Sequence, residues 1–358
     1  MKNKLMVLTL IPISFILTTY AKFNLSFAEF YAVEIYPVFA GAISFFTSKI
    51  SGSLAEIIIA ALIILLIIYT LSMAINSFKH KTTNFFKNYI ANIGVAVSCI
   101  YCLFVLFCGL NYYRYEFTHY SGLVIEESSK EELVNLCEIL INDANEMRGK
   151  LNTSNDNTAA LYDYNYYGTS KRAKNSFNSI SAKYEILKGN YPAPKPVKLS
   201  KIMSHMNITG IYFPFTFEAN VNVDIPPYQI PATMLHELVH LRGFMREDEA
   251  NFISYLACIN SGYDDFAYSG TMLALTYSMN ALYAEDYDSF AKLYETYSED
   301  VKNDIAFSKN YWKQFDTKVA EISSNINDTY LKANNQEDGV KSYGKMVDLL
   351  LAYYRNLA

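Results

Sequence analysis

The stretch PATMLHELVHLRGFMREDEANF, residues 231–252, contains two of the chain's five histidines together with four carboxylates. His236 and His240 are four residues apart, which on an α-helix is slightly more than one turn and about 6 Å of rise. Both imidazoles therefore project from one face and can converge on one metal ion. Glu237, next to the first histidine, can reach a metal-bound water instead of the metal. This His-Glu-x-x-His arrangement is typical of zinc peptidases.

A catalytic zinc site also needs a third protein ligand and an open position for water. No histidine follows His240, so the remaining candidates are Glu247, Asp248 and Glu249. Glu247 and Asn251 are one turn apart on a predicted second helix, and a ligating Glu247 would let Asn251 hydrogen-bond a ligating histidine. We therefore expect Glu247 as the third ligand and Asn251 as its supporting neighbour, with Glu249 as the alternative ligand. Asp248 is expected on the solvated face of the helix.

The elements around this motif can also be predicted. Pro231 suits the first turn of the motif helix, and Gly243 suits its C-terminal cap. Residues 208–227 are rich in aromatic and β-branched types with Pro and Gly between them, which predicts one or two strands. Residues 128–147 and 169–187 have apolar residues at helical spacing, and the first of these begins with a capping-box pattern. The remainder of the chain after the motif is predicted to be mainly helical.

Three apolar segments in the first third predict a membrane region over residues 1–112. They cover about residues 5–21, 54–75 and 90–110, and a bilayer core needs about 20 apolar residues in a helix. Hydrophobic residues make up 51% of the chain and charged residues only 18%. That balance favours membrane attachment. The first segment is shorter and lacks a clear cleavage site, so we expect a retained helix, with a signal peptide as the alternative. Residues 113–358 are expected to form one polar domain.

The lysines of this region predict its orientation. The loop between the second and third apolar segments carries Lys79, Lys81 and Lys87, and the N-terminus carries Lys2 and Lys4. The positive-inside rule puts both in the cytoplasm. A third crossing then leaves the polar domain outside the cytoplasm, in a multi-pass protein of the cell membrane.

Net charge bears on the binding partners of the chain, and the cysteine positions bear on its disulfides and metal sites. The formal net charge is −5, the isoelectric point is about 5.6 and no basic tract is present. Nucleic acid is therefore not expected as a partner. Cys99 and Cys102 have the spacing of a redox or metal pair, but their apolar surroundings favour helix packing. A disulfide between Cys137 and Cys258 can be neither derived nor excluded from the sequence.

The motif region resembles two groups of proteins. HELVH followed by Glu-x-x-Ala-Asn resembles the gluzincin metallopeptidases, in which the third ligand is a glutamate on a following helix. Nearly the whole chain is similar to a bacterial, membrane-anchored family catalogued only as a domain of unknown function. The segments that carry this similarity are GIYFPFTFEANVN, PATMLHELVHLRGFMREDEANFISYLAC, YSGTMLAL and QEDGVKSYG.

The resemblance implies a mainly α (α+β) fold, with three transmembrane helices followed by a mostly helical, zincin-like domain that contains a small sheet. It also implies one Zn²⁺ ion and no established substrate. The gap between His240 and Glu247 is shorter than in other gluzincins, which leaves the choice between Glu247 and Glu249 open. In gluzincins an edge strand beside the site binds the peptide substrate. Residues 214–223, with Ala219, Asn220 and Val221, are the candidate by position, and an ordinary structural strand is an equal alternative.

These features together predict a membrane-anchored, zinc-dependent metalloendopeptidase in which Glu237 takes a proton from water. Its partners would be the lipid bilayer and a protein or peptide substrate. His205, Tyr268 and Tyr343 are candidates for stabilising the oxyanion, with no basis in the sequence for choosing among them. One alternative is a catalytically silent sensing or binding protein with a structural metal site. An intramembrane protease is the other, but charged residues follow the short motif helix at once.

Overall fold

The computed structural model describes most of the chain, namely residues 2–154, 156–163, 165–190, 192–334, 336 and 345–357. The chain divides into two compact units. The first contains residues 1–114 together with Phe213–Phe217, and the second contains residues 115–212 and 218–358. The sequence predicted a boundary at 112/113, close to the observed one, but held no sign that Phe213–Phe217 belongs with the N-terminal residues. Tyr343 and most of the segment QEDGVKSYG lie outside the described residues.

The first unit is helical. Its elements in the described part of the chain are α1 (Lys2–Leu8), α2 (Leu10–Phe23), α3 (Leu25–Phe30), the π-helix η1 (Tyr31–Ile35), α4 (Tyr36–Thr47), α5 (Leu54–His80), α6 (Asn84–Phe107) and the 3₁₀-helix η2 (Gly109–Tyr113).

The three predicted apolar segments all form helices, but a fourth stretch does so as well. Four helices of the described chain are long and apolar enough to cross a membrane: Met6–Phe23, Leu25–Thr47, Leu54–His80 and Asn84–Phe107. The sequence analysis singled out only three of these four stretches. Leu25–Thr47 escaped notice because Glu29, Glu34 and Pro37 interrupt its apolar run. These two acids lower the mean hydropathy without ending the helix.

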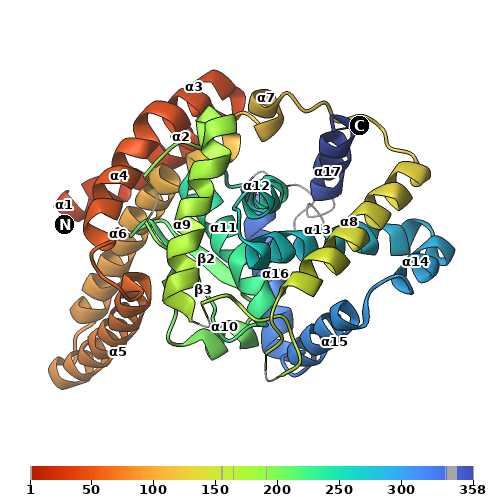
Figure 1. The fold of residues 1–358 in the computed structure, drawn as a ribbon. Coiled ribbons are helices and arrows are strands. Elements are labelled where there is room, and N and C mark those ends of the chain that lie inside the picture. The colour runs from red at the N-terminus through yellow and green to blue at the C-terminus, as the bar shows by residue number, and fades with distance from the viewer. Residues whose placement is uncertain are drawn as a thin grey trace. The chain divides into compact units, whose positions relative to one another are not determined.

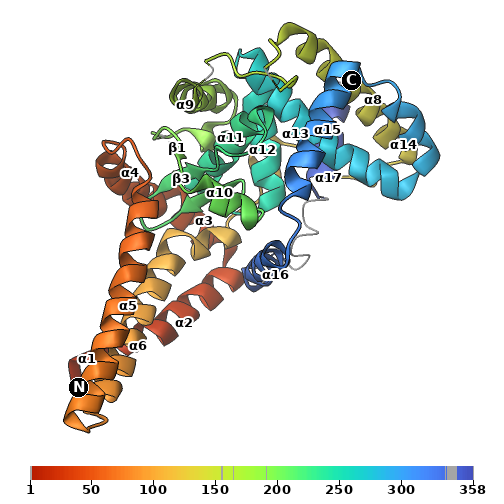
Figure 2. The ribbon, with the colours of Figure 1, turned by 90° about the horizontal axis from the view of Figure 1, so that it is seen from below.

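Helices α1, α2 and α5 all pack along α6. Helix α5 is apolar all round and mostly exposed, as expected for a surface that faces lipid rather than water. Helices α5 and α6 form an antiparallel hairpin in which the Thr70 hydroxyl lies 2.9 Å from the Tyr89 hydroxyl. Figure 2 shows these two helices side by side.

The second unit is mainly helical with a small sheet, as the sequence predicted. Its helical elements in the described residues are α7 (Phe117–Ser121), α8 (Lys130–Lys150), α9 (Tyr166–Lys183), η3 (Glu185–Leu187), α10 (Ser200–His205), η4 (Pro227–Gln229), α11 (Ile230–Leu241), α12 (Glu247–Ile259), α13 (Asp264–Glu285), α14 (Tyr287–Tyr294), α15 (Glu299–Lys313), α16 (Lys318–Ala333) and α17 (Lys345–Arg355). Its strands are β1 (Lys195–Pro196), β2 (Gly210–Phe213) and β3 (Glu218–Val221).

The core of the second unit is built around three helices, α11, α12 and α13, each of which contacts the other two. They lie next to one another in Figure 1. Helices α12 and α13 come close where Gly270 faces Cys258, because a Cβ on Gly270 would collide with the Cβ of Cys258. Helix α8 covers α13, and α9 covers α11 and α12. The α11 helix, which carries the motif, is therefore held on several sides.

The sheet has the order β1-β3-β2, so β3 is its central strand. Strands β1 and β3 are parallel, with Lys195 opposite Asn220. Strands β2 and β3 are neighbours joined by a short connection, which makes them a hairpin. Strand β3 also contacts helix α11, so the sheet lies against the motif helix.

Several helix ends were predicted correctly from local signals. The capping box before α8 is present, with both the Ser129 and the Glu132 side chains bonded to backbone N–H groups. Pro231 lies in the first turn of α11. Gly243 has φ 94°, a left-handed conformation that favours glycine, and it ends the motif helix as predicted. All five cysteines are free, and Cys137 and Cys258 are both buried without a disulfide between them.

Candidate metal site

Helix α11 presents the motif because its other faces are apolar. Leu235, Leu238 and Val239 are completely buried, which fixes the rotation of the helix about its axis. The remaining face carries His236 and His240. The chain then turns at Gly243 and enters α12, whose first residue is Glu247. The turn thus brings the first residue of α12 back towards the histidine face.

His236, His240 and Glu247 come together at one point. Their ligand-type atoms all lie within 4.8 Å of one another. Nε2 of His236 is 3.1 Å from Oε2 of Glu247, and Nε2 of His240 is 3.6 Å from Oε1 of the same carboxylate. The two Nε2 atoms are 3.0 Å apart. The structure thus gathers the three residues that the sequence singled out as metal ligands.

The two imidazoles are held in orientation from behind. Nδ1 of His240 donates a hydrogen bond of 2.9 Å to the carbonyl oxygen of Phe244, which leaves the Nε2 lone pair facing the cluster. His236 is hydrogen-bonded by the Asn251 side chain. Asn251 in turn donates to the hydroxyl of Tyr277 at 3.3 Å. Such contacts to the far side of a ligand fix its tautomer and direction.

Protonation in the cluster is uneven. Burial acts to lower the pKa of His236, but the hydrogen bond and negative charge of Glu247 outweigh it and raise the pKa above the ordinary value. Burial lowers the pKa of His240 to about 4. Burial acts to raise the pKa of Glu247, yet the two imidazoles hold it below the usual value. Near neutral pH the cluster therefore contains an ionised Glu247 carboxylate and a neutral His240 imidazole.

Glu237 lies on the same helix but has a different environment. Its side chain is buried, and its Oε2 atom has no hydrogen-bond partner among the described residues. Burial, aided by the negative charge of Glu247, raises the pKa of Glu237 to about 8. A backbone hydrogen bond from Tyr212 on β2 also reaches the carboxylate. Gly210 on the same strand packs against it, because a Cβ there would lie 2.5 Å from Oε1.

The donor set fits a divalent cation such as Zn²⁺. Two imidazole nitrogens and one carboxylate are the ligands that catalytic zinc sites use, with a fourth position left for water. The side chains of His236 and Glu247 remain 15% and 16% exposed, so the cluster is open on one side. The Oε2 atom of Glu237 is a buried acceptor without a partner in the described chain. Such orphaned groups are uncommon in proteins.

The alternative ligand, Glu249, is not part of this cluster. Its two oxygens accept hydrogen bonds from the Arg246 side chain at 2.9 and 3.0 Å, and one also accepts from the Phe117 backbone. These bonds tie α7 to the start of α12. Asp248, between the two glutamates, also lies outside the cluster, and burial raises its pKa to about 6. Of the three acids, Glu247 alone meets the histidines.

The expected substrate strand requires a correction. Ala219, Asn220 and Val221 are buried in β3, which has neighbours on both sides and offers no free edge to a peptide. Of the two alternatives for this strand, the structure therefore contradicts the edge strand and agrees with an ordinary structural strand. The sequence predicted one or two strands here but not their order in the sheet. Edge strands of this sheet are β1 and β2, and β2 carries the groups that touch Glu237.

The two oxyanion candidates that the structure describes, Tyr268 and His205, are not part of this cluster. Tyr268 donates its hydroxyl to Asp304 at 2.6 Å inside the core, and His205 is exposed with its ring against Phe315. Sequence reasoning also missed Tyr277, whose pKa is raised by burial and by the charge of Glu247. With 31 tyrosines in the chain, no sequence signal distinguishes this one.

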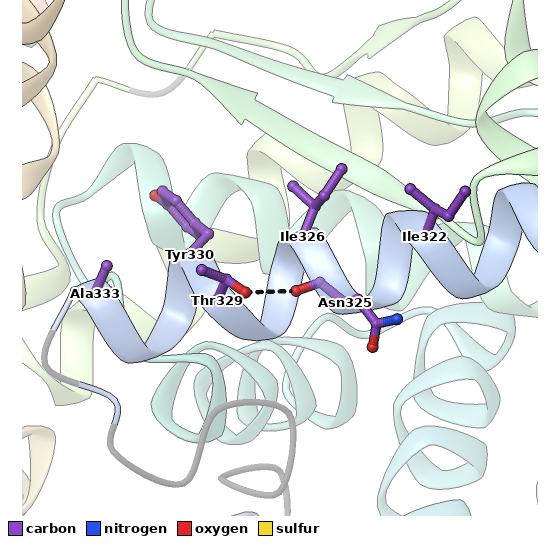
Figure 3. A pocket seen from close by; sticks show the side chains of 6 residues that line it. All are labelled: Ile322, Asn325, Ile326, Thr329, Tyr330 and Ala333. Carbon is purple, nitrogen blue, oxygen red and sulfur yellow. Dashed lines mark hydrogen bonds between the residues drawn. The ribbon is translucent and has the colours of Figure 1, made fainter.

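A shallow apolar groove on α16 is separate from this cluster. Figure 3 shows its lining, with the Thr329 hydroxyl donating to the Asn325 carbonyl at 2.8 Å. The residues that line it are Ile322, Asn325, Ile326, Thr329, Tyr330 and Ala333. No member of the His236–His240–Glu247 cluster is among them.

The structure describes a mostly helical protein with apolar N-terminal helices and a partly buried His/His/Glu cluster. The chain belongs to the family described as Protein of unknown function (DUF3810), whose model matches residues 31–351. The resemblance to a domain of unknown function is thereby confirmed. No curated protein and no solved structure matches the chain significantly.

Proposed function

We propose that the second unit is a zinc-dependent metallopeptidase of gluzincin type, anchored in a membrane by the first unit. The observation that carries the proposal is the convergence of His236, His240 and Glu247 within 4.8 Å, beside a buried glutamate oxygen without a partner among the described residues. Two imidazole nitrogens and a carboxylate that meet at one point are the protein ligands that a catalytic zinc ion uses. The extra glutamate provides a group that can accept a proton.

In this proposal each residue has a separate role. His236, His240 and Glu247 bind one zinc ion, which when bound polarises a peptide carbonyl and lowers the pKa of water towards 7. Glu237 Oε2 accepts a proton from the attacking water. The hydroxyl adds to the acyl carbon, the C–N bond breaks, and Glu237 returns the proton to the leaving amine. Asn251 and Phe244 position the two imidazoles.

The position of Glu237 favours this function over a structural metal site. Structural zinc sites are usually closed by four Cys or His ligands, whereas this cluster has three candidate ligands and partial exposure. A silent sensing or binding protein would also give no role to the buried Oε2 atom of Glu237. Burying an acceptor without a hydrogen bond costs free energy of folding, and in such a protein no function would offset that cost.

We also propose that the second unit lies outside the cytoplasm. Lys79, Lys81 and Lys87 lie near the turn between α5 and α6, and Lys2 and Lys4 lie at the N-terminus. This distribution supports a cytoplasmic location for that turn and for the N-terminus. Substrates would then be proteins or peptides on the outer side of the membrane.

The test is proteolysis by the detergent-solubilised full chain. Wild type should cleave casein, a chelator should abolish the cleavage, and added zinc should restore it. The Glu237→Gln variant should keep its zinc and lose activity by about 10²–10⁴-fold, the usual contribution of a general base. Asp248→Asn is the matched control, because it changes a neighbouring carboxylate outside the cluster. Zinc-loaded, folded wild type that cleaves no peptide, or a Glu237→Gln variant with full activity, would contradict the proposal.

A further inference from the structure

The helical segment Leu25–Thr47, here named the connecting segment, is apolar and long enough to cross a bilayer. We infer that it does not cross, and that it lies in the interfacial layer of the membrane as a link between two crossing helices. The partner that its exposed side chains contact is thus the lipid of the interface. This inference is independent of the proposed peptidase activity. It leaves α1–α2, α5 and α6 as the three crossing elements.

Both ends of the connecting segment lie at the same level of the helix bundle. Leu8 lies opposite Gly94, since a Cβ there would be 3.3 Å from a Leu8 methyl group, and α2 also contacts η2. The α1–α2 stretch runs parallel to α6, and both rise by the same distance per residue. Counting 15 residues onward from Leu8 and from Gly94 therefore places Phe23 level with Gly109. The segment therefore begins near the C-terminal end of α6.

Helix α5 begins at that level as well. It is antiparallel to α6, with Thr70 opposite Tyr89. Counting equal steps in opposite directions from this pair places Leu54 level with Val105. A segment that leaves and rejoins the bundle at one level has no net displacement across the membrane. Its length of 23 residues suffices for one crossing but not for a crossing and a return, because it amounts to about 34 Å of helix.

The contacts of the segment indicate a steep angle to α6. The Tyr31 hydroxyl donates to the Leu106 carbonyl at 2.6 Å, and the Phe39 ring lies 5.6 Å from that of Phe107. The advance from Tyr31 to Phe39, about 12 Å of helix, thus corresponds to a single step along α6. If the connecting segment were parallel to α6, eight residues along the segment would correspond to about eight residues along α6. Figure 2 shows α3 and α4 at the end of the bundle where α6 ends.

Charges give two further arguments. Glu34 is exposed and lies near the middle of the segment, where a crossing helix would hold it at the bilayer centre at high cost. With three crossings, Lys2, Lys4, Lys79, Lys81 and Lys87 share one side, against Lys22 and Lys49 on the other. With four crossings, Lys49 would join Lys2 and Lys4 on one side, and the other four lysines would lie on the opposite side. The positive-inside bias would then be lost. The exposed large side chains of the segment are aromatic and aliphatic, so the segment can lie against lipid.

The test is cysteine labelling of the full chain in intact cells with a membrane-impermeant maleimide, with unmodified chain as background. Suitable single variants are Phe23→Cys, Ser51→Cys, Thr83→Cys and Lys171→Cys. The first two flank the connecting segment, the third marks the α5–α6 turn and the fourth marks the second unit. We expect Phe23→Cys and Ser51→Cys to label on the same side as Lys171→Cys, and Thr83→Cys on the opposite side. Phe23→Cys and Ser51→Cys on opposite sides would overturn the inference.

A depth measurement provides the second readout on purified chain in lipid vesicles. A spin label at Val38→Cys should show comparable collision with oxygen and with a polar nickel chelate, as expected at the interface. The matched control is Ile64→Cys in the middle of α5, where oxygen should dominate. Both side chains are exposed, at 68% and 57%. Equal depth for the two labels would overturn the inference even if the labelling proved inefficient at Phe23→Cys.

Discussion

Two buried polar clusters of the second unit differ in how completely their charges are paired. In the first, Asp304 accepts from Arg148 at 2.8 Å and from Tyr268 at 2.6 Å through one oxygen, and from the Ala159 backbone at 2.9 Å through the other. In the second, Glu237 keeps an oxygen without a partner among the described residues. A buried network with every group satisfied stabilises a fold, whereas one with an unpaired group costs stability.

The two clusters also differ in their exposure to solvent. Arg148 and Asp304 have side chains that are 1% and 0% exposed, so solvent has no access to them. The His236–Glu247 pair is 15% and 16% exposed. An unsatisfied acid beside a partly exposed His/His/Glu cluster is therefore the feature on which the proposed function depends.

Matched carboxylate-to-amide substitutions provide the strongest test of this contrast. Asp304→Asn should destabilise the second unit by about 3–5 kcal/mol, because it leaves the Arg148 cation buried without its counter-charge. Glu237→Gln should change stability by less than about 1 kcal/mol, since the replaced oxygen has no hydrogen bond to lose. Thermal unfolding of the full chain measures both, at about 2–4 °C per kcal/mol for a domain of this size. Equal losses in the two variants would remove the distinction between the clusters.

Zinc should act on one cluster only. At a free zinc concentration about 100 times its dissociation constant, wild type should gain about 2.7 kcal/mol of stability, because the ion binds the folded state alone. His240→Ala should show no gain. His205→Ala is the matched control, since that histidine is exposed and outside the cluster, and it should respond like wild type. A zinc response that survives in His240→Ala would place the ion elsewhere.

The contact between β2 and Glu237 predicts a smaller effect. Gly210→Ala puts a Cβ 2.5 Å from Glu237 Oε1, so the strand or the carboxylate has to move. We expect hydrolysis to fall about 10-fold, or about 1.4 kcal/mol in the barrier, with zinc content unchanged. Gly149→Ala, in α8 with open space around it, is the control and should leave activity intact. Unaltered hydrolysis in Gly210→Ala would mean that the position of the carboxylate is not critical.

The smallest effect concerns a surface ion pair that belongs to neither cluster. Arg355 bonds both oxygens of Glu132, at 2.6 and 2.9 Å, and its hydrogen bond lowers the pKa of Glu132 to about 2. Because this pKa is depressed in the folded state, the pair stabilises above the unfolded value of about 4.3. The benefit is lost as pH falls towards the folded value.

Glu132→Gln should therefore melt slightly below wild type at pH 7, and the gap should narrow as the pH falls below about 4.3 and close towards about 2, the pKa of Glu132 in the folded protein. Glu131→Gln, one residue earlier and outside the pair, is the control and should show no such closing gap. Melting curves at four or five pH values are sufficient. A gap for Glu132→Gln that does not depend on pH would show that the pair has no part in stability.

Sequence reasoning located the ligand cluster because its signal is local. Two histidines four residues apart share a helix face whatever the rest of the fold, and the turn at Gly243 is visible as a cap. The capping box at Ser129 and Glu132 was predictable for the same reason. Each of these features depends on residues within one or two turns of each other.

Features that depend on distant residues could not be predicted. Whether β3 is central or at an edge depends on β1, which is only two residues long and comes well before β3 in the chain. The contact of Gly210 with Glu237 likewise joins two separate elements, β2 and α11. The helix Leu25–Thr47 was hidden for a different reason, since its acids mask an apolar helix from a search for uninterrupted runs.

The most direct test of the central claim is the metal content of the purified full chain. We expect about one zinc per chain in wild type and in His205→Ala, and none in His236→Ala, His240→Ala or Glu247→Ala, with all five folded. Glu249→Gln should retain zinc wherever it remains folded. Folded wild type that binds no divalent ion, even after incubation with zinc, would show that His236, His240 and Glu247 do not form a metal site.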